Sequence, residues 1–449
     1  MQENKMGTEP VGKLLISMAF PAIISMSISA LYNIVDSIFV SMIGEKALTA
    51  VSLVMPMQVL MIALGVGTGV GANSLISRRL GEKRQEMANK AASISLKLPI
   101  LNYVIFLFIG LLATKPFIGY YTNDPIIREY GTQYMTIACC FCFFLMFQLA
   151  IEKVLQATGN MLGSMITSLT GALVNTILDP TLIFGLFGFP RLGVVGAAVA
   201  TIFGQAASVC VGVFILQRKN SLIKVSWFDF RPDLTVTKEI YMVGFPAIVM
   251  QALFGAVTII YNAILAASAT AVAVLGAYFK LESMIFMPLF GLNQGALPIL
   301  GYNYGAKNRA RMMKAFKLSM IAANVFLGAS TFLFLFFPRA MLSIFSATDE
   351  MYRIGIPALR IICLSFLPAG FSIITATLFQ AMGNGFTSMI ATIIRQCAVL
   401  LPASYLLMKF FGLRTSWYAF PIAEVCGTIY MAIMFVKIKR KKLPPDFGK

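Results

Sequence analysis

Long apolar runs recur along almost the whole chain and constrain its fold more than any other feature. Runs of roughly 20 or more apolar residues are long enough to cross a bilayer as helices. Hydrophobic residues make up 58% of the chain and charged residues only 12%. The runs are continuous and do not alternate in the way a membrane barrel requires. We therefore predict an all-α polytopic membrane protein.

Twelve such runs can be delimited as membrane spans. They cover residues 13–43, 48–76, 92–113, 130–152, 161–187, 194–217, 240–267, 271–300, 315–337, 354–380, 386–409 and 416–437. The first run is too long for the apolar region of a signal peptide, so no cleavable signal is expected.

An internal repeat divides the chain in two. FPAII at 20–24 returns as FPAIV at 245–249, and QATGN at 156–160 returns as QAMGN at 380–384. FPAII and FPAIV are 225 residues apart, and the QATGN motifs are 224 apart. Three glycine pairs are also 224 residues apart: Gly67 with Gly291, Gly71 with Gly295, and Gly81 with Gly305. Six spans in each half preserve orientation, which predicts two six-helix lobes related by a pseudo-twofold axis along the membrane normal. The expected divisions are an N-terminal lobe (1–220), a cytoplasmic linker (221–239), a C-terminal lobe (240–438) and a basic cytoplasmic tail (439–449).

The basic residues explain the formal net charge of +18 and predict the topology. They gather in the loops after even-numbered spans and near the termini, with stretches such as RRLGEKRQEMANK and KIKRKK. Cytoplasmic loops carry this excess of Lys and Arg, so both termini are expected in the cytoplasm of a prokaryotic cell, with the protein in the inner membrane. Nucleic-acid binding needs a basic face on a soluble domain, and no such domain is expected.

Several chemistries are disfavoured by what the sequence contains. Histidine is absent, which removes imidazole bases and ligands, and the seven cysteines lie within apolar runs, where they are expected to act as small hydrophobes. The glycine run GVGTGVG at 65–71 lies inside a span, which favours close helix packing over phosphate binding. We expect no enzymatic activity, no cofactor and no structural metal.

A few ionisable residues interrupt the apolar runs. Each is unfavourable in the bilayer by several kcal/mol unless it is paired or hydrated, so a functional role is the first hypothesis. They are Asp36, Asp179, Lys280, Glu282, Arg395 and Glu424, with Glu152 and Lys153 near a span end. The alternative is structural ion pairing: Lys280 and Glu282 could neutralise one another or meet Arg395. Glu424 has no visible partner in the sequence.

Two acids in the first half stand out. Tyr32 and Asp36 lie four residues apart on one helix face, and Asn175 and Asp179 share the same spacing. Carboxylates flanked by neutral hydrogen-bonding groups suit a reversible cation or proton site, whereas the alternative is a polar pair that only fixes helix packing. The repeat places Tyr261 opposite Asp36 and Ala403 opposite Asp179, so these acids are confined to one half.

The chain resembles a known transporter family. YNIVDSIFV, ISRRLGEKR, LQATGN, NTILDPTLIFGLFGFPRLGVVGAAVAT and GALPILGYNYGAKN are similar to segments of the multidrug and toxic compound extrusion (MATE) transporters. The resemblance covers nearly all of the chain. It implies two lobes around a central cleft, alternating access, and multidrug efflux of cationic or amphipathic compounds driven by proton or sodium influx.

The resemblance also implies roles for individual residues. Asp36, Asn175, Asp179 and Thr201 match the polar proton or sodium site of the branch that couples through its N-terminal lobe, with Tyr32 beside them. Spans 7 and 10 lack the interior acids of the other branch, apart from Glu239 at the entry to span 7. Candidate contacts with the organic substrate in the cavity are Glu282, Arg395, Tyr261 and Gln251.

Alternatives to multidrug export remain open. A flippase for lipid-linked oligosaccharides belongs to the same superfamily, but such proteins often have more spans and a more cationic cavity. A channel fits the twofold repeat with one-sided acids less well than alternating access does. The expected partners are small organic cations and the lipid bilayer, and we expect a monomer.

Overall fold

The computed structural model describes residues 4–218, 222–226, 233–266, 268–345 and 347–441. Within these ranges the chain is almost entirely helical and has no β-strand. Eleven helices are long and apolar enough to cross a membrane, and a bent pair brings the number to twelve if it counts as one span. This confirms the predicted helical membrane class. Most of the expected basic tail, from residue 442 on, lies outside the described residues, as does 227–232 of the expected linker.

The N-terminal lobe contains the first six spans. They are α2 (Val11–Ile43); α3 (Glu45–Gly81); a third span of α4 (Gln85–Ser95), α5 (Leu98–Phe108), η1 (Ile109–Ala113) and α6 (Thr114–Tyr121); a fourth of α7 (Pro125–Cys140) and α8 (Phe143–Ala157); α9 (Met161–Phe184); and α10 (Val194–Arg218). The short helices α1 (Lys5–Thr8) and η2 (Leu186–Gly188) lie outside these spans.

The C-terminal lobe contains the other six. They are α11 (Leu234–Leu265); α12 (Ala269–Gly305); α13 (Arg309–Phe336), followed by the short α14 (Pro338–Ser343); a tenth span of α15 (Asp349–Ile362), η3 (Cys363–Ser365) and α16 (Phe366–Ala381); an eleventh of α17 (Gly385–Ile393), η4 (Ile394–Leu400) and α18 (Leu401–Phe411); and a twelfth of α19 (Leu413–Ser416) and α20 (Ala419–Lys441).

The helices differ from the predicted spans in length and continuity. The predictions 48–76 and 271–300 stop before α3 and α12 end at Gly81 and Gly305, because these helices continue through polar residues that hydropathy does not count. The fourth span is bent by 46° between α7 and α8. The third and eleventh spans each contain a π-helical segment, η1 and η4, where a wider turn interrupts the α-helix.

The repeated QATGN and QAMGN motifs form equivalent turns between spans. Gly159 and Gly383 have φ angles of +83° and +84°, a left-handed conformation that glycine adopts without strain. Asn160 then caps α9 by accepting a hydrogen bond from the Gly163 backbone amide at 3.0 Å. The motif therefore ends one helix and starts the next in both lobes.

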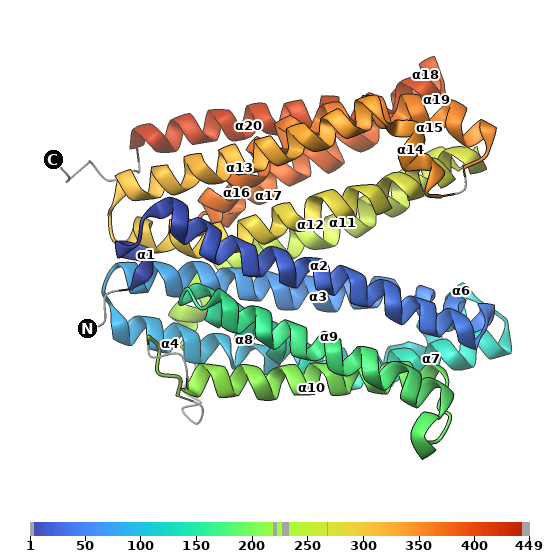
Figure 1. Cartoon of the computed structure of the whole chain (residues 1–449), viewed down its shortest axis with the longest axis horizontal. Coiled ribbons are helices and arrows are strands. Elements are labelled where there is room, and N and C mark those ends of the chain that lie inside the picture. Colours follow the sequence, from blue (N-terminus) through green and yellow to red (C-terminus); the bar gives the residue numbers. More distant parts are fainter. Residues whose placement is uncertain (1–3, 219–221, 227–232, 267, 346, 442–449) are drawn as a thin grey trace.

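The two lobes meet along two repeat-related seams and diverge beyond them (Figure 1). Helix α1 and the last turns of α20 lie at the end of the molecule where α2 packs against α12 and α3 against α11. Towards the opposite end the ribbons separate, with α6 and α7 on one lobe and α15 and α18 on the other.

Repeated glycines allow the helices to approach in these seams. A Cβ added at Gly71 would overlap the Ile240 carbonyl oxygen, and one at Gly295 would lie 2.7 Å from the Ala19 Cα. The glycines of 65–71 therefore serve helix packing, as the sequence predicts. Gly71 and Gly295 are repeat partners, so equivalent glycines allow close helix packing in both seams.

Candidate functional site

Asp36 on α2 and Asp179 on α9 meet inside the N-terminal lobe. Their carboxyl groups are within interaction range of one another, and Asp179 is fully buried. The Asn175 side-chain amide donates to Asp179 Oδ1 and to Thr201 Oγ1, each at 3.3 Å. Four residues expected at one polar site are thus brought together from three helices.

Several oxygens of this site have no hydrogen-bond donor. Asp36 Oδ1, Asp179 Oδ2 and Asn175 Oδ1 are buried and lack a partner among the described residues. Neither carboxylate forms an ion pair with Lys or Arg in the described part of the chain. Unpaired acceptor oxygens in a low-dielectric interior are costly unless a proton or a cation binds them.

Two tyrosines and a glutamine surround the acids. Tyr32, one turn before Asp36, and Tyr134 on α7 both interact electrostatically with the two carboxylates. Tyr134 Oη accepts a hydrogen bond of 3.1 Å from Gln58 Nε2 of α3. Sequence reasoning missed Tyr134 and Gln58. Gln58 could have been noticed as a polar residue in an apolar span, whereas Tyr134 carries no local signal.

The donor set offers oxygen atoms and no soft ligand. Carboxylate, amide and hydroxyl oxygens suit a proton or a hard cation such as sodium. No group of three or more His, Cys, Asp or Glu side chains that could hold a metal ion occurs among the described residues. The four residues Asp36, Asn175, Asp179 and Thr201 therefore fit a weakly held monovalent cation or a shared proton.

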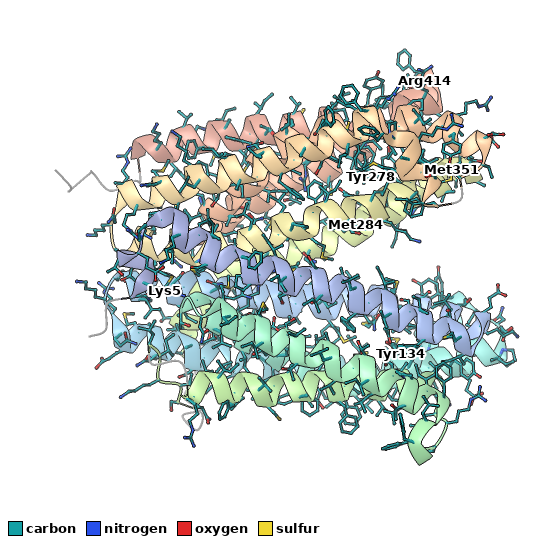
Figure 2. All side chains as sticks on the ribbon, in the orientation of Figure 1. Lys5, Tyr134, Tyr278, Met284, Met351 and Arg414 are labelled. Carbon is teal, nitrogen blue, oxygen red and sulfur yellow. The ribbon has the colours of Figure 1, made fainter. Side chains whose placement is uncertain are left out.

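A second, partly buried polar cluster lies in the C-terminal lobe. Arg395 of η4 contacts both carboxylate oxygens of Glu424 on α20, at 3.1 and 3.2 Å. Glu282 on α12 interacts with the Tyr278 hydroxyl and faces the Arg395–Glu424 pair. Figure 2 shows Tyr278 in this lobe and Tyr134 in the other.

This cluster resolves the pairing that the sequence left open. Glu424, which had no visible partner, is the partner of Arg395. Lys280 does not pair with Glu282, because its ammonium lies over the Phe345 ring at 5.9 Å from the centroid. Side chains two residues apart on a helix point in different directions, so Lys280 and Glu282 face different surroundings.

The other two cavity candidates differ in exposure. Tyr261 is fully buried, donates a long hydrogen bond of 3.5 Å to the Ser416 carbonyl, and packs on Phe420. Gln251 is exposed on α11. The structure therefore places Tyr261 in the packing of the lobe and Gln251 on its surface.

Lys153 joins the lobes next to the seam. Its side chain, on α8, is buried and donates to Gln156 at 3.0 Å and to Gln294 of α12 at 2.9 Å. The neighbouring Glu152 accepts a hydrogen bond from Gln148 at 2.9 Å. The adjacent charges thus point to different partners, one across the interface and one within the lobe.

Comparison with known proteins agrees with this architecture. A family model, MatE, matches residues 21–181 and again 246–406, so each lobe matches once. The multidrug export protein MepA of Staphylococcus haemolyticus is 27% identical over 437 residues, covering 97% of this chain and 95% of that protein. An FAD transporter of Shewanella oneidensis is 25% identical over 424 residues, covering 93% and 92%.

Solved structures share the fold. A MOP superfamily transporter from Pyrococcus furiosus, described as having a binding pocket of reverse polarity, matches with a TM-score of 0.89 at 25% identity over 98% of this chain and 99% of that one. An outward-facing multidrug resistance MATE family transporter matches with a TM-score of 0.88 at 24% identity over the same shares.

Proposed function

Because the chain belongs to the MatE family, we propose that it is a secondary active antiporter that exports cationic or amphipathic organic compounds by alternating access. The multidrug export proteins among its relatives support this function. The chain is an integral protein of the cell membrane, and we place both termini in the cytoplasm on the basis of its basic loops.

The observation that carries the proposal is the Asp36–Asp179 pair. Two carboxylates with unpartnered oxygens lie close together, and neither forms an ion pair with Lys or Arg among the described residues. Such a pair binds a proton or sodium reversibly, since the ion removes an uncompensated charge. Asn175 donates hydrogen bonds to Asp179 and to Thr201, and Tyr32 lines the same site.

Coupling follows if the ion and the organic compound stabilise different states. A ligand with equal affinity for two conformations shifts neither population. Ion binding at Asp36 changes the charge on α2, which contains Pro21 within the helix and forms a seam with α12. We expect this change to repack α2 and thereby alter the space that the substrate occupies.

We expect the two lobes to move relative to each other at the two seams, where α2 packs against α12 and α3 against α11. They lie at the end of the molecule that carries α1 and the last turns of α20, which we assign to the cytoplasm. The lobes pack against each other at this end and their ribbons diverge towards the other (Figure 1), and we propose that separation of the seams gives the opposite state of the cycle. Glu282, Arg395 and Gln251 remain the proposed substrate contacts, whereas Tyr261, also a candidate from the sequence, is fully buried in the packing of the C-terminal lobe. We expect a monomer to carry out the cycle.

The test is ethidium efflux from proteoliposomes with independently imposed pH and sodium gradients. We expect export that depends on one of the two gradients, which also identifies the coupling ion. Asp36→Asn should abolish gradient-driven export, whereas the matched variant Asp349→Asn, at an exposed helix start, should export normally. Undiminished export by Asp36→Asn at equal protein levels would refute the role of this acid.

A further inference from the structure

Two connections at the end of the molecule opposite the seams carry large apolar side chains that the described chain leaves uncovered. Between α9 and α10, Phe187 is 90% exposed and Phe189 is 52% exposed. At the junction of α18 and α19, Phe410 is 68% exposed and Phe411 is 71% exposed. Figure 1 shows the first loop projecting beyond α9 and α10, with α18 and α19 at the same end of the other lobe.

The internal repeat relates these two connections. An offset of 224 residues aligns LFGF at 186–189 with FFGL at 410–413, and an arginine follows each motif, Arg191 and Arg414. The glycine of each motif has a positive φ angle, +85° and +87°. We call residues 186–191 and 410–414 the apolar tips. Both halves of the chain thus contain an exposed apolar tip with a basic residue.

Hydrogen bonds hold each tip against its own helices. The Leu192 amide donates to the Leu182 carbonyl at 3.0 Å, which closes the base of the first loop. The Thr415 hydroxyl donates to the Leu407 carbonyl at 3.1 Å, across the second tip. These bonds join residues before and after each tip, so the tips have a defined position at the ends of their helices.

Other connections at this end are polar. The turns from α2 to α3, from α6 to α7 and from α14 to α15 contain or adjoin Glu45 and Lys46, Asn123 and Asp124, and Asp349 and Glu350. The apolar character of the two tips is therefore not shared by these neighbouring connections.

Both tips carry positive charge without a carboxylate partner. Arg191 and Arg414 are exposed and form no ion pair in the described part of the chain. Figure 2 labels Arg414 at the far end of the C-terminal lobe. Lys409 lies next to the second tip, with its ammonium 5.9 Å from the centroid of the Phe410 ring. Aromatic rings beside free basic groups suit the boundary where acyl chains meet lipid phosphates.

The spans next to the tips also present apolar faces. Phe203 and Phe214 lie three turns apart on one face of α10 and are 57% and 56% exposed, and Ile422 and Ile429 are exposed on α20. Helices α10 and α20 form the outer flanks of the two lobes (Figure 1). In a membrane protein such flanks face lipid, and the tips continue them beyond the helix ends.

Helix lengths place the tips near the headgroups. Helices α9 and α10 have 24 and 25 residues, which at 1.5 Å per residue gives about 36 Å and about 38 Å. The span Gly385–Phe411 has 27 residues, or about 40 Å. A hydrocarbon core of about 30 Å leaves about 3–5 Å at each end of a centred span, which lies within the headgroup region.

We propose that the two apolar tips are paired lipid anchors, one on each lobe. Their phenylalanines insert at the boundary between headgroups and acyl chains, and Arg191 and Arg414 bind lipid phosphates. With both termini in the cytoplasm, as proposed above, these lipids belong to the outer leaflet. The anchors depend on the placement of the chain in the bilayer and not on the exported compound or the coupling ion.

The test is quenching of single tryptophans by brominated lipids. The two native tryptophans are replaced by phenylalanine, Phe187→Trp or Phe411→Trp is introduced, and the protein is reconstituted into phosphatidylcholine liposomes. Bromine near the glycerol end of the acyl chain should lower the fluorescence about twofold, and bromine near the methyl end should lower it less, because the tips lie at the interface. Asn123→Trp and Glu350→Trp, at exposed polar connections of the same end, are the matched controls and should keep their fluorescence.

Charge variants and the wild-type chain provide two further measurements. In the Phe187→Trp protein, Arg191→Glu should reduce the quenching about twofold because a carboxylate repels phosphate, whereas Arg191→Lys should retain it. Wild-type protein needs no substitution: a phospholipid with a photoreactive diazirine near its headgroup should label peptides that contain 186–191 and 410–414, and not the turn at 122–124. Peptide mass spectrometry locates the label.

Tip tryptophans that brominated lipids do not quench, or quenching of equal size at the controls, would overturn the inference. Wild-type protein without label at either tip would do the same, and a tip shielded from aqueous acrylamide without lipid quenching would point to a protein partner instead of lipid. Quenching unchanged by Arg191→Glu would overturn the phosphate contact. Quenched tips in a protein that exports no ethidium would leave the anchors in place and refute only the proposed export.

Discussion

Replacing Gln294 by leucine tests whether the polar contact between the lobes stabilises the state described here. The Gln294 side-chain oxygen accepts hydrogen bonds from Lys153 Nζ at 2.9 Å and from Gln156 Nε2 at 3.0 Å. Both donors belong to the opposite lobe, and leucine cannot accept either bond. Among the described residues, the hydrogen bond of Lys153 to Gln156 within its own lobe is unaffected.

The size of the effect can be worked out from these two bonds. A hydrogen bond to a charged group contributes about 1.5 kcal/mol at the lower end, and a neutral interhelical bond in a membrane contributes about 0.6 kcal/mol. Their loss destabilises the closed seam by about 2 kcal/mol. Since 1.4 kcal/mol corresponds to a factor of ten, the equilibrium should shift roughly 30-fold towards separation of the seam.

Double electron–electron resonance measures this shift directly. Spin labels at Thr49→Cys and Glu350→Cys, both exposed and on opposite lobes, are introduced after the native cysteines are replaced. We expect Gln294→Leu to increase the population with a shorter distance between the labels, because the far ends approach as the seam opens.

The matched control is Gln148→Leu, which removes a hydrogen bond to Glu152 within a single lobe. It should leave the distance distribution unchanged. A distribution for Gln294→Leu that equals that of the wild type and of this control would refute the reasoning that the Lys153 contact holds the lobes together.

Two further changes test the seam and the second cluster. Gly71→Ala should reduce ethidium efflux more than tenfold, because the added Cβ overlaps the Ile240 carbonyl oxygen. Gly276→Ala, whose Cβ would have no atom within 4 Å, should export normally. Equal efflux rates for the two variants would contradict the role of close helix packing in the seam. Glu424→Gln should lower the free energy of unfolding by about 2 kcal/mol by leaving Arg395 unpaired, and addition of Arg395→Met should restore part of it in thermal unfolding; additive losses would argue against the ion pair.

The local sequence was sufficient to predict the membrane class and the repeat. Hydropathy is a property of consecutive residues, so apolar runs reveal spans without knowledge of their neighbours. The glycine run at 65–71 predicted close helix packing, and the structure places Gly71 and its repeat partner Gly295 in equivalent seams. Breaks within spans escaped prediction, because a bend such as that between α7 and α8 leaves the apolar composition unchanged.

The sequence also identified the ionisable side chains that are unfavourable in the bilayer, but it could not assign all their partners. Asp36 and Asp179 were expected together and do meet, whereas the role of their site stays a proposal. Glu424 seemed unpaired because Arg395, 29 residues away, reaches it only through the packing of η4 against α20. Tyr134 and Gln58 likewise reach the acid site only through the packing of α7 and α3.

The sequence by itself therefore determined what must lie in the membrane, that the chain repeats in two halves, and which charges need compensation, since these depend on composition and spacing. Only the tertiary structure decided which helices are neighbours and how each is rotated about its axis. That rotation brings Asp36 and Asp179 close together, pairs Arg395 with Glu424, and places Glu282 beside that pair.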